Sequence, residues 1–321
     1  MAAIEAEGLR RTYKTTTGVV RRKSLEIEAV RGIDFAVAEG ELFGLLGPNG
    51  AGKTTTIKML ITLLIPTAGK ARVLGLDVVK DAREVRKRIG YVFGGERGVY
   101  ERLSGYDNLR YFAELYGVPP KEQKRRIEEL LELVGLKGRE HERAEGYSRG
   151  MKQRLHVARG LLHDPQVVFL DEPTIGLDPV GAREVRAMIA ALTAAGKTVL
   201  LTTHYMFEAD ALCDRIAVIS QGEIVAEGTP TDLKRGVAEG TVVEVEVFGG
   251  ADDAVGRVRG LGGVMSVTIE EREQAQVLVV QTEATVELTQ AILGCLDGAD
   301  VGRISQREPT LEDAYVALVT E

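Results

Sequence analysis

One segment of the sequence has residue types and a spacing that suit phosphate binding. Residues 47–54 read Gly-Pro-Asn-Gly-Ala-Gly-Lys-Thr and fit the pattern G-x-x-x-x-G-K-[ST]. The glycines let backbone N–H groups turn toward phosphate oxygens, Lys53 can reach the outer phosphates, and the Thr54 hydroxyl is placed to hold Mg²⁺. A glycine-rich structural turn is the alternative, but an apolar strand over 42–46 and a helix flank the loop, as the motif requires. The residues expected to bind the nucleotide are Gly47, Pro48, Asn49, Gly50, Ala51, Gly52, Lys53, Thr54 and Thr55.

A pair of adjacent carboxylates, Asp171 and Glu172, follows an apolar strand expected over 167–170. Successive strand residues point to opposite faces, so the two acids are expected to differ in role. Asp171 suits Mg²⁺ binding through water, and Glu172 is then free to orient or deprotonate an attacking water as a general base. Two acids at a strand end are often only a solvated terminus, but the upstream phosphate loop favours the catalytic interpretation.

His204 closes a further apolar strand, expected over 198–203. If this strand neighbours the one that ends at Asp171, the histidine lies beside both acids at the carboxyl edge of the sheet, where ligands bind in such folds. There we expect His204 to hydrogen-bond the terminal phosphate. The other three histidines are expected to be structural.

These residues need an α/β framework to position them, and the first 230 residues predict one. Short apolar runs alternate with helical patterns, which is typical of layered α/β folds. Gly135 and Gly196 are expected to end two helices, and Asp178 followed by proline predicts the start of another. After Gly240 the pattern changes to β-α-β-β-α-β over about 80 residues, an order that resembles a ferredoxin-like module.

Composition narrows the class of protein. The net charge of -7 argues against a nucleic-acid partner, which usually needs a basic surface. A membrane-spanning helix needs about 20 apolar residues in a row, and the run over 59–65 is far too short. The acidic start of the sequence is unlike a secretory signal. The two cysteines fit no metal spacing and suit a reducing compartment.

A family resemblance rests on residues 147–154, Tyr-Ser-Arg-Gly-Met-Lys-Gln-Arg, which lead into an apolar-striped helix. This segment looks like the signature motif of ATP-binding cassette (ABC) proteins, whose common form is Leu-Ser-Gly-Gly-Gln. Ser148 and Gly150 match that form, whereas Tyr147, Arg149 and Met151 are variants that resemble drug-exporter cassettes. Ser148 also suits the N-cap of the helix, which is a ready anion site.

The order of further motifs strengthens the resemblance. Tyr13 lies where the family has an aromatic residue that stacks on adenine, Asp178 lies in the position of the D-loop, and His204 matches the switch histidine. The resemblance therefore implies a P-loop NTPase cassette with a mixed sheet over residues 4–235, with a helical subdomain at about 100–160. A small ferredoxin-like α+β domain is expected over 240–321.

The resemblance also implies an activity and partners. ATP with Mg²⁺ would lie between Lys53 of one cassette and Ser148, Arg149, Gly150 and Met151 of a second cassette, and hydrolysis would separate the two. Such a chain is expected to work at the cytoplasmic face of the membrane with an integral-membrane permease subunit. The C-terminal module resembles the extension of daunorubicin-resistance cassettes, which often ends in a stretch like residues 307–313, Arg-Glu-Pro-Thr-Leu-Glu-Asp. We expect a dimer-stabilising or regulatory role for this module rather than substrate binding.

One departure from the family concerns the glutamine that normally follows the strand over 89–93. Gly95 or Glu96 must occupy that place here. In the family the glutamine touches Mg²⁺ and the nucleophilic water. Hydrolysis is therefore expected to be slow, or a partner cassette is expected to carry the better site.

Three functions are compatible with these residues. The first is the ATP-hydrolysing subunit of an exporter for a drug-, antibiotic- or lipid-like compound. The second is a soluble cassette that acts on the ribosome or DNA, although the sequence has neither a second cassette nor a long coiled-coil or zinc insertion. The third is a regulatory cassette that hydrolyses ATP slowly. Homodimer and heterodimer both remain open.

Overall fold

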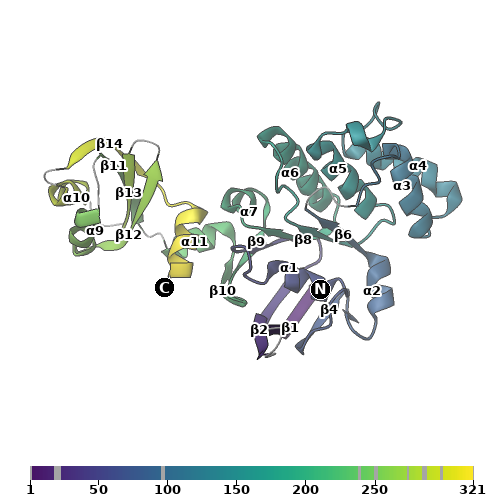
Figure 1. Cartoon of the computed structure of the whole chain (residues 1–321), viewed down its shortest axis with the longest axis horizontal. Helices are drawn as coiled ribbons and strands as arrows, with labels where there is room; N and C mark the ends of the chain where they lie inside the picture. The colour runs from purple at the N-terminus through teal and green to yellow at the C-terminus, as the bar shows by residue number, and fades with distance from the viewer. Residues whose placement is uncertain are drawn as a thin grey trace. The chain divides into compact units, whose positions relative to one another are not determined.

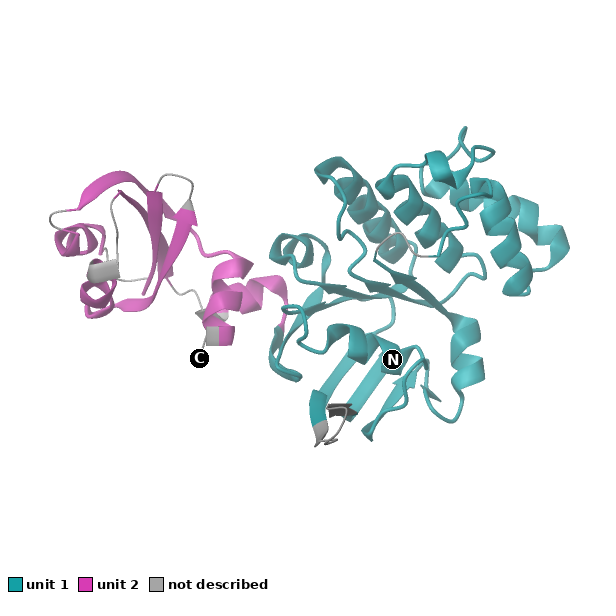
Figure 2. Cartoon of the chain, in the orientation of Figure 1, with its two compact units in different colours: residues 1–227 teal, residues 228–321 magenta. Residues whose placement is uncertain are grey.

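The structure is a computed structural model. It describes residues 2–17, 23–94, 98–237, 240–248, 252–272, 275–283, 288–296 and 299–320. The chain forms two compact units, 1–227 and 228–321 (Figure 2). Within the described part of the chain, no helix combines the length and the apolar character that crossing a bilayer requires.

A six-stranded sheet with the order β10-β9-β3-β8-β7-β6 forms the centre of the first unit. The strand pairs β9-β3, β3-β8, β8-β7 and β7-β6 are all parallel. Every residue of β3, β7 and β8 is buried, as expected for parallel strands covered on both faces. The strands are β3 (Leu42–Leu46), β6 (Ile89–Phe93), β7 (Val167–Asp171), β8 (Thr198–Thr203), β9 (Arg215–Ser220) and β10 (Glu223–Gly228).

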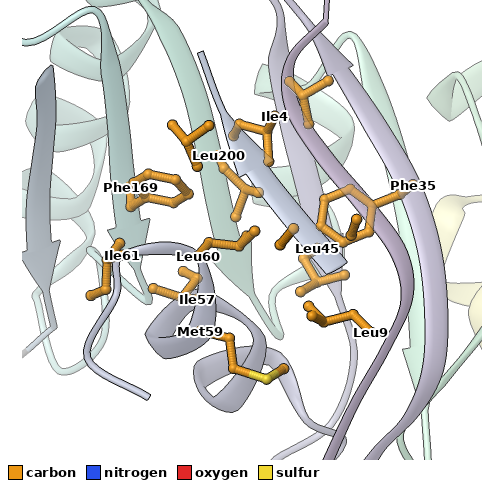
Figure 3. Close-up of a cluster of buried hydrophobic side chains, with 14 of the residues drawn as sticks. Ile4, Leu9, Phe35, Leu45, Ile57, Met59, Leu60, Ile61, Phe169 and Leu200 are labelled. Atoms are coloured by element: carbon orange, nitrogen blue, oxygen red, sulfur yellow. The ribbon is translucent and has the colours of Figure 1, made fainter. Parts of the chain in front are cut away.

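A second sheet, with the order β2-β1-β4-β5, covers one side of this centre and is antiparallel. Its strands are β1 (Ala2–Thr17), β2 (Lys23–Ala38), β4 (Ala68–Val73) and β5 (Leu76–Asp77). Helix α1 (Lys53–Leu60) lies between the two sheets (Figure 3). Its Ile57 and Leu60 are fully buried and join one core with Leu45 of β3 and Phe35 of β2. Because α1 begins at Lys53, this core holds the phosphate loop in place.

Helices cover the opposite side of the central sheet (Figure 1). Gly135 and Gly196, predicted to end helices, both have the positive φ that such a residue needs, 63° and 80°. Besides α1, the described helices of the first unit are α2 (Ala82–Arg88), α3 (Gly105–Leu115), α4 (Pro120–Leu133), the 3-10 turn η1 (Ala144–Gly146), α5 (Arg149–Gly160), α6 (Pro179–Ala194) and α7 (Met206–Leu212).

The second unit is built on a four-stranded antiparallel sheet with the order β12-β13-β11-β14. Helices α9 and α10 bury Val258 and Ile292 against one face of this sheet. Helices α8 and α11 pack against each other. The elements are α8 (Pro230–Val237), β11 (Gly240–Phe248), α9 (Asp252–Arg259), β12 (Val264–Arg272), β13 (Ala275–Glu283), α10 (Thr289–Cys295), β14 (Asp300–Arg307) and α11 (Leu311–Thr320).

The tail segment 307–313 forms a compact polar network. Arg307 binds both carboxylate oxygens of Asp313, at 2.6 and 3.0 Å, and also Glu244 of β11 at 2.6 Å. Asp313 in turn accepts hydrogen bonds from the backbone N–H and the hydroxyl of Thr310, both at 2.7 Å. The network therefore ties the first turn of α11 to the sheet.

Candidate active site

The loop over residues 47–54 leaves β3 and enters α1 with its backbone turned inward. Gly50 and Gly52 have φ values of 86° and 111°, a region that residues with a side chain rarely adopt. A Cβ at Gly52 would lie 2.5 Å from the carbonyl oxygen of Ala29, so this position also requires glycine for space. The result is a set of N–H groups at the N-terminus of a helix, which favours a phosphate.

Lys53 is 4% exposed and occupies the centre of the loop. Its Nζ donates hydrogen bonds to the carbonyl oxygens of Gly47 at 2.6 Å and Pro48 at 3.0 Å. The same Nζ lies 3.3 Å from Oε1 of Glu172. The ammonium group thus links the phosphate loop to the carboxylate that the sequence assigns as the base.

Asp171, the last residue of β7, faces the loop. Its Oδ1 accepts hydrogen bonds from the hydroxyl of Thr54 at 3.1 Å and from that of Thr202 at 2.6 Å. Three oxygen atoms from three elements therefore meet at one point. Oxygen donors with a single carboxylate fit the usual protein contribution to a Mg²⁺ site, in which phosphates and water supply the rest.

Thr202 is a site residue that the sequence analysis missed. Parallel pairing places it directly opposite Asp171, and its backbone carbonyl and hydroxyl both accept from the N–H of Glu172, at 3.0 and 3.1 Å. The run Thr202-Thr203-His204 at a strand end was a usable signal, but only the register of β7 against β8 tells which threonine meets the aspartate.

Glu172 has a φ of 49°, which is uncommon for a residue with a side chain. Such conformations cluster at active sites, where the surrounding structure holds them in place. The N–H of Gly94 binds the carbonyl oxygen of Asp171 at 2.6 Å, and a Cβ at Gly94 would lie 2.3 Å from the carbonyl oxygen of Glu172. Glycine at position 94 therefore lets β6 support this turn from the other side.

His204 reaches the same carboxylate. Its Nδ1 lies 3.3 Å from Oε2 of Glu172, a close contact that does not form a hydrogen bond within the described part of the chain. The side chains of His204 and Glu172 are 26% and 17% exposed, so both remain accessible from the loop side. The predicted neighbours Asp171, Glu172 and His204 thus lie together at the carboxyl edge of the sheet.

A pocket of about 120 Å³ opens over the loop. Of the expected binding residues, those in its described lining are Asn49, Gly50, Gly52, Lys53, Thr54 and Thr55, and Ala29 and Glu172 complete it. Gly47, Pro48 and Ala51 are not in this described lining; Gly47 and Ala51 are buried, whereas Pro48 is exposed. Tyr13 lies outside this lining and stacks under Arg11, whose Cζ is 4.8 Å from the ring centroid.

The signature residues lie outside this pocket. Ser148 caps α5 and accepts from the N–H of Met151 at 3.2 Å, and both Ser148 and Arg149 are exposed. Asp178 caps α6 and accepts from two N–H groups at 3.0 Å, and these hydrogen bonds, chiefly that from Gly181, lower the pKa of its carboxyl. The two capped helices meet through glycines, because a Cβ at Gly150 would lie 3.5 Å from the Cα of Gly181.

Gly95 and Glu96, the two candidates for the glutamine position, lie outside the described residues.

Comparison with known proteins identifies the family. The ABC transporter family profile matches residues 30–175. The linearmycin resistance ATP-binding protein LnrL of Bacillus subtilis (strain 168) is 37% identical over 84% of this chain and 83% of its own length. The daunorubicin resistance ATP-binding protein DrrA3 of Streptomyces coeruleorubidus is 39% identical over 96% of each chain. This chain belongs to the ABC transporter ATP-binding proteins.

The fold comparison agrees with the family. A solved structure described as the ATP-binding subunit of an ABC transporter is 30% identical, with a TM-score of 0.60. It covers 73% of this chain and 92% of its own length. The predicted α/β fold of a P-loop cassette is thereby confirmed. ATP is the nucleotide, and an ABC cassette is an ATP-hydrolysing enzyme.

Proposed function

We propose that this chain is the ATP-hydrolysing subunit of an ABC exporter that moves a drug-, antibiotic- or lipid-like compound through a separate membrane subunit. The observation that carries the proposal is the likeness to DrrA3, a protein named for daunorubicin resistance, over nearly the whole of both chains. LnrL, named for linearmycin resistance, supports the same class of cargo. The chain would work at the cytoplasmic face of the membrane.

In the proposed reaction, the N–H groups of the loop and Lys53 bind the ATP phosphates. Thr54 and Asp171 would hold Mg²⁺, which supplies charge neutralisation at the phosphates. Glu172 takes a proton from the attacking water, and its position in the lining of the loop pocket supports this role. His204 would hydrogen-bond the terminal phosphate.

A second cassette completes the proposed site. Exposed Ser148 and Arg149 at the N-terminus of α5 would contact the ATP held by the other cassette, together with Gly150 and Met151. Asp178 would lie at the boundary between the cassettes, and Tyr13 would stack on adenine. The hydroxyl of Ser148 already accepts one hydrogen bond and keeps its proton for a phosphate oxygen.

We further propose that residues 4–235 act as the cassette, with a helical subdomain at about 100–160, and that residues 240–321 form a separate regulatory or dimer-stabilising domain of the ferredoxin-like type. The presence of two units and the order β12-β13-β11-β14 support two domains, but the units divide between residues 227 and 228, so α8 belongs with the second unit.

The proposal is tested by ATP hydrolysis of the purified chain and its Glu172→Gln variant. The variant keeps size and hydrogen bonding but cannot accept the proton, so hydrolysis should fall by at least about 100-fold while ATP binding persists. An exposed acid on the adjoining hairpin, changed as Glu223→Gln, is the matched control and should hydrolyse at the wild-type rate. A Glu172→Gln variant as fast as wild type would contradict the assigned base.

A further inference from the structure

Glu208, in the first turn of α7, is a buried acid for which the proposed reaction has no use. The side chain is 1% exposed, although carboxylates are rarely enclosed without a partner. Within the described residues, neither carboxylate oxygen has a well-formed hydrogen bond. An enclosed polar group of this kind destabilises a fold unless it interacts with something, so its presence calls for a role.

The polar neighbours of Glu208 come from the two segments that carry the reacting groups. Thr203 ends β8 directly before His204, and Thr174 lies in the turn between Glu172 and the cap of α6. Thr203 is 1% exposed and Thr174 is 5% exposed, so both hydroxyls are enclosed with the acid. Each threonine also takes part in its own turn: Thr203 Oγ1 accepts from the N–H of Tyr205 at 3.0 Å, and the Thr174 carbonyl accepts from that of Leu177 at 3.2 Å.

The charged and titratable groups that face Glu208 are Arg186 of α6, His204, and Cys213 after α7. Burial raises the pKa of Glu208, and this effect outweighs the threonine hydroxyls, Arg186 and His204, which lower it. Burial, with Glu208 nearby, raises the pKa of the Cys213 thiol, so the thiol is neutral. A carboxyl group has two oxygen atoms, so it can join two hydroxyl groups at once.

We propose that Glu208 is a positioning residue whose carboxyl group bridges Thr203 and Thr174 and so fixes His204 relative to Glu172. The proposal rests on the hydrolytic role given above to Glu172 and His204. Through Thr174 the bridge also reaches the turn that leads to Asp178, where a second cassette would bind. Glu208 touches neither ATP nor water in this arrangement and acts through the two threonines.

Two variants separate this role from simple filling of space. Glu208→Gln keeps a donor and an acceptor in the same place, whereas Glu208→Met keeps the volume and removes both. Replacing a buried polar group by an apolar one of similar size often leaves stability unchanged or higher, so Glu208→Met should fold. Thermal unfolding of both variants checks this directly.

We expect kcat for ATP hydrolysis to fall about tenfold or more in Glu208→Met with KM unchanged, because small misplacements of reacting groups are costly. Glu208→Gln should stay within about twofold of wild type, since its amide keeps two polar atoms that can bond the two hydroxyl groups. A Glu208→Met variant as fast as wild type, or a Glu208→Gln variant as slow as Glu208→Met, would overturn the proposal.

Amide hydrogen exchange gives a readout that does not need hydrolysis. Exchange over residues 173–178 and 203–208 should rise in Glu208→Met and stay at the wild-type level in Glu208→Gln. Equal exchange in all three proteins would refute the bridge even if the wild type proved inactive. An inactive wild type with the expected exchange pattern would instead count against the proposed function alone.

Discussion

At the scale of single residues, the site is a set of opposing charges held close together. Lys53 lies between two loop carbonyls and the carboxylate of Glu172, and His204 approaches the other oxygen of that carboxylate. A nucleotide phosphate brings negative charge that the loop N–H groups and Lys53 are placed to receive. The cation is therefore the residue on which ATP binding depends most.

Lys53→Ala should weaken ATP binding by at least about 100-fold, because a charge-assisted hydrogen bond of the largest usual strength is lost and no other described cation lines the pocket. Fluorescent-nucleotide titration measures this. Lys58→Ala, an exposed lysine on the same helix, is the matched control and should bind as wild type does. Equal affinity in the Lys53 variant would show that the loop is not the ATP site.

His156 predicts a pH effect on stability. Burial and nearby Arg159 lower the pKa of His156 from 6.5 to about 3. Below pH 6.5 the unfolded chain binds a proton on this ring and the folded chain does not. The free energy of unfolding is therefore highest above pH 6.5 and decreases as the pH falls toward 3. Between pH 7 and pH 5 the loss should be about 2 kcal/mol.

Denaturant unfolding at the two pH values measures this loss. His156→Asn cannot take up this proton, so its loss of unfolding free energy between pH 7 and pH 5 should be about 2 kcal/mol smaller than that of wild type. His141→Asn, at an exposed histidine, should keep the wild-type dependence. An unchanged pH dependence in His156→Asn would show that the buried ring is not the source.

At the scale of elements, strand register determines which residues meet. The sequence is sufficient to predict the loop, the acid pair and His204, because each lies at the end of an apolar strand and parallel strands share an edge. It could not select Thr202, which depends on β7 pairing with β8 in one register. Nor could it show that Gly94 must lack a side chain, since that follows from its contact with Glu172, far away in sequence.

In the second unit, too, the sequence predicts the elements but not the contacts between distant residues. The order of strands and helices after Gly240 follows from alternating and helical patterns, which are local. The partners of Arg307 are Asp313, six residues on, and Glu244, which is distant. Only the pairing of β11 with β14 brings Glu244 to the tail segment.

The tail network predicts a stability effect at this scale. Arg307→Met should destabilise the second unit by about 1–2 kcal/mol, because Asp313, 8% exposed, loses its partner. This destabilisation is smaller than that expected for a fully buried ion pair, because the Arg307 side chain is 32% exposed and water screens its charge. Arg303→Met, at an exposed position of the same strand, is the control. Chemical unfolding followed by exchange in residues 300–320 makes the measurement, and equal stability of the two variants would argue against the network.

At the scale of the whole molecule, one chain supplies two half-sites that face different ATP molecules in the proposed assembly. The loop pocket has its own lining, and the exposed N-terminus of α5 lies outside that lining. Assemblies made only of Glu172→Gln chains or only of Ser148→Arg chains should each have two impaired sites. A mixed assembly should have one doubly altered site and one intact site, and should therefore hydrolyse ATP faster than either variant alone. A Ser148→Arg variant that hydrolyses ATP as fast as wild type, or no gain of activity on mixing, would mean that each chain works alone.

The central claim is that this ATPase drives a separate membrane protein, and isolation of the tagged chain from gently solubilised membranes of its own cells tests it most directly. We predict that a multi-span membrane protein is recovered in fixed proportion, and that ATP hydrolysis of the isolated complex drops at least about 100-fold with Glu172→Gln. Recovery of the chain only with ribosomes, nucleic acid or soluble proteins would contradict the claim.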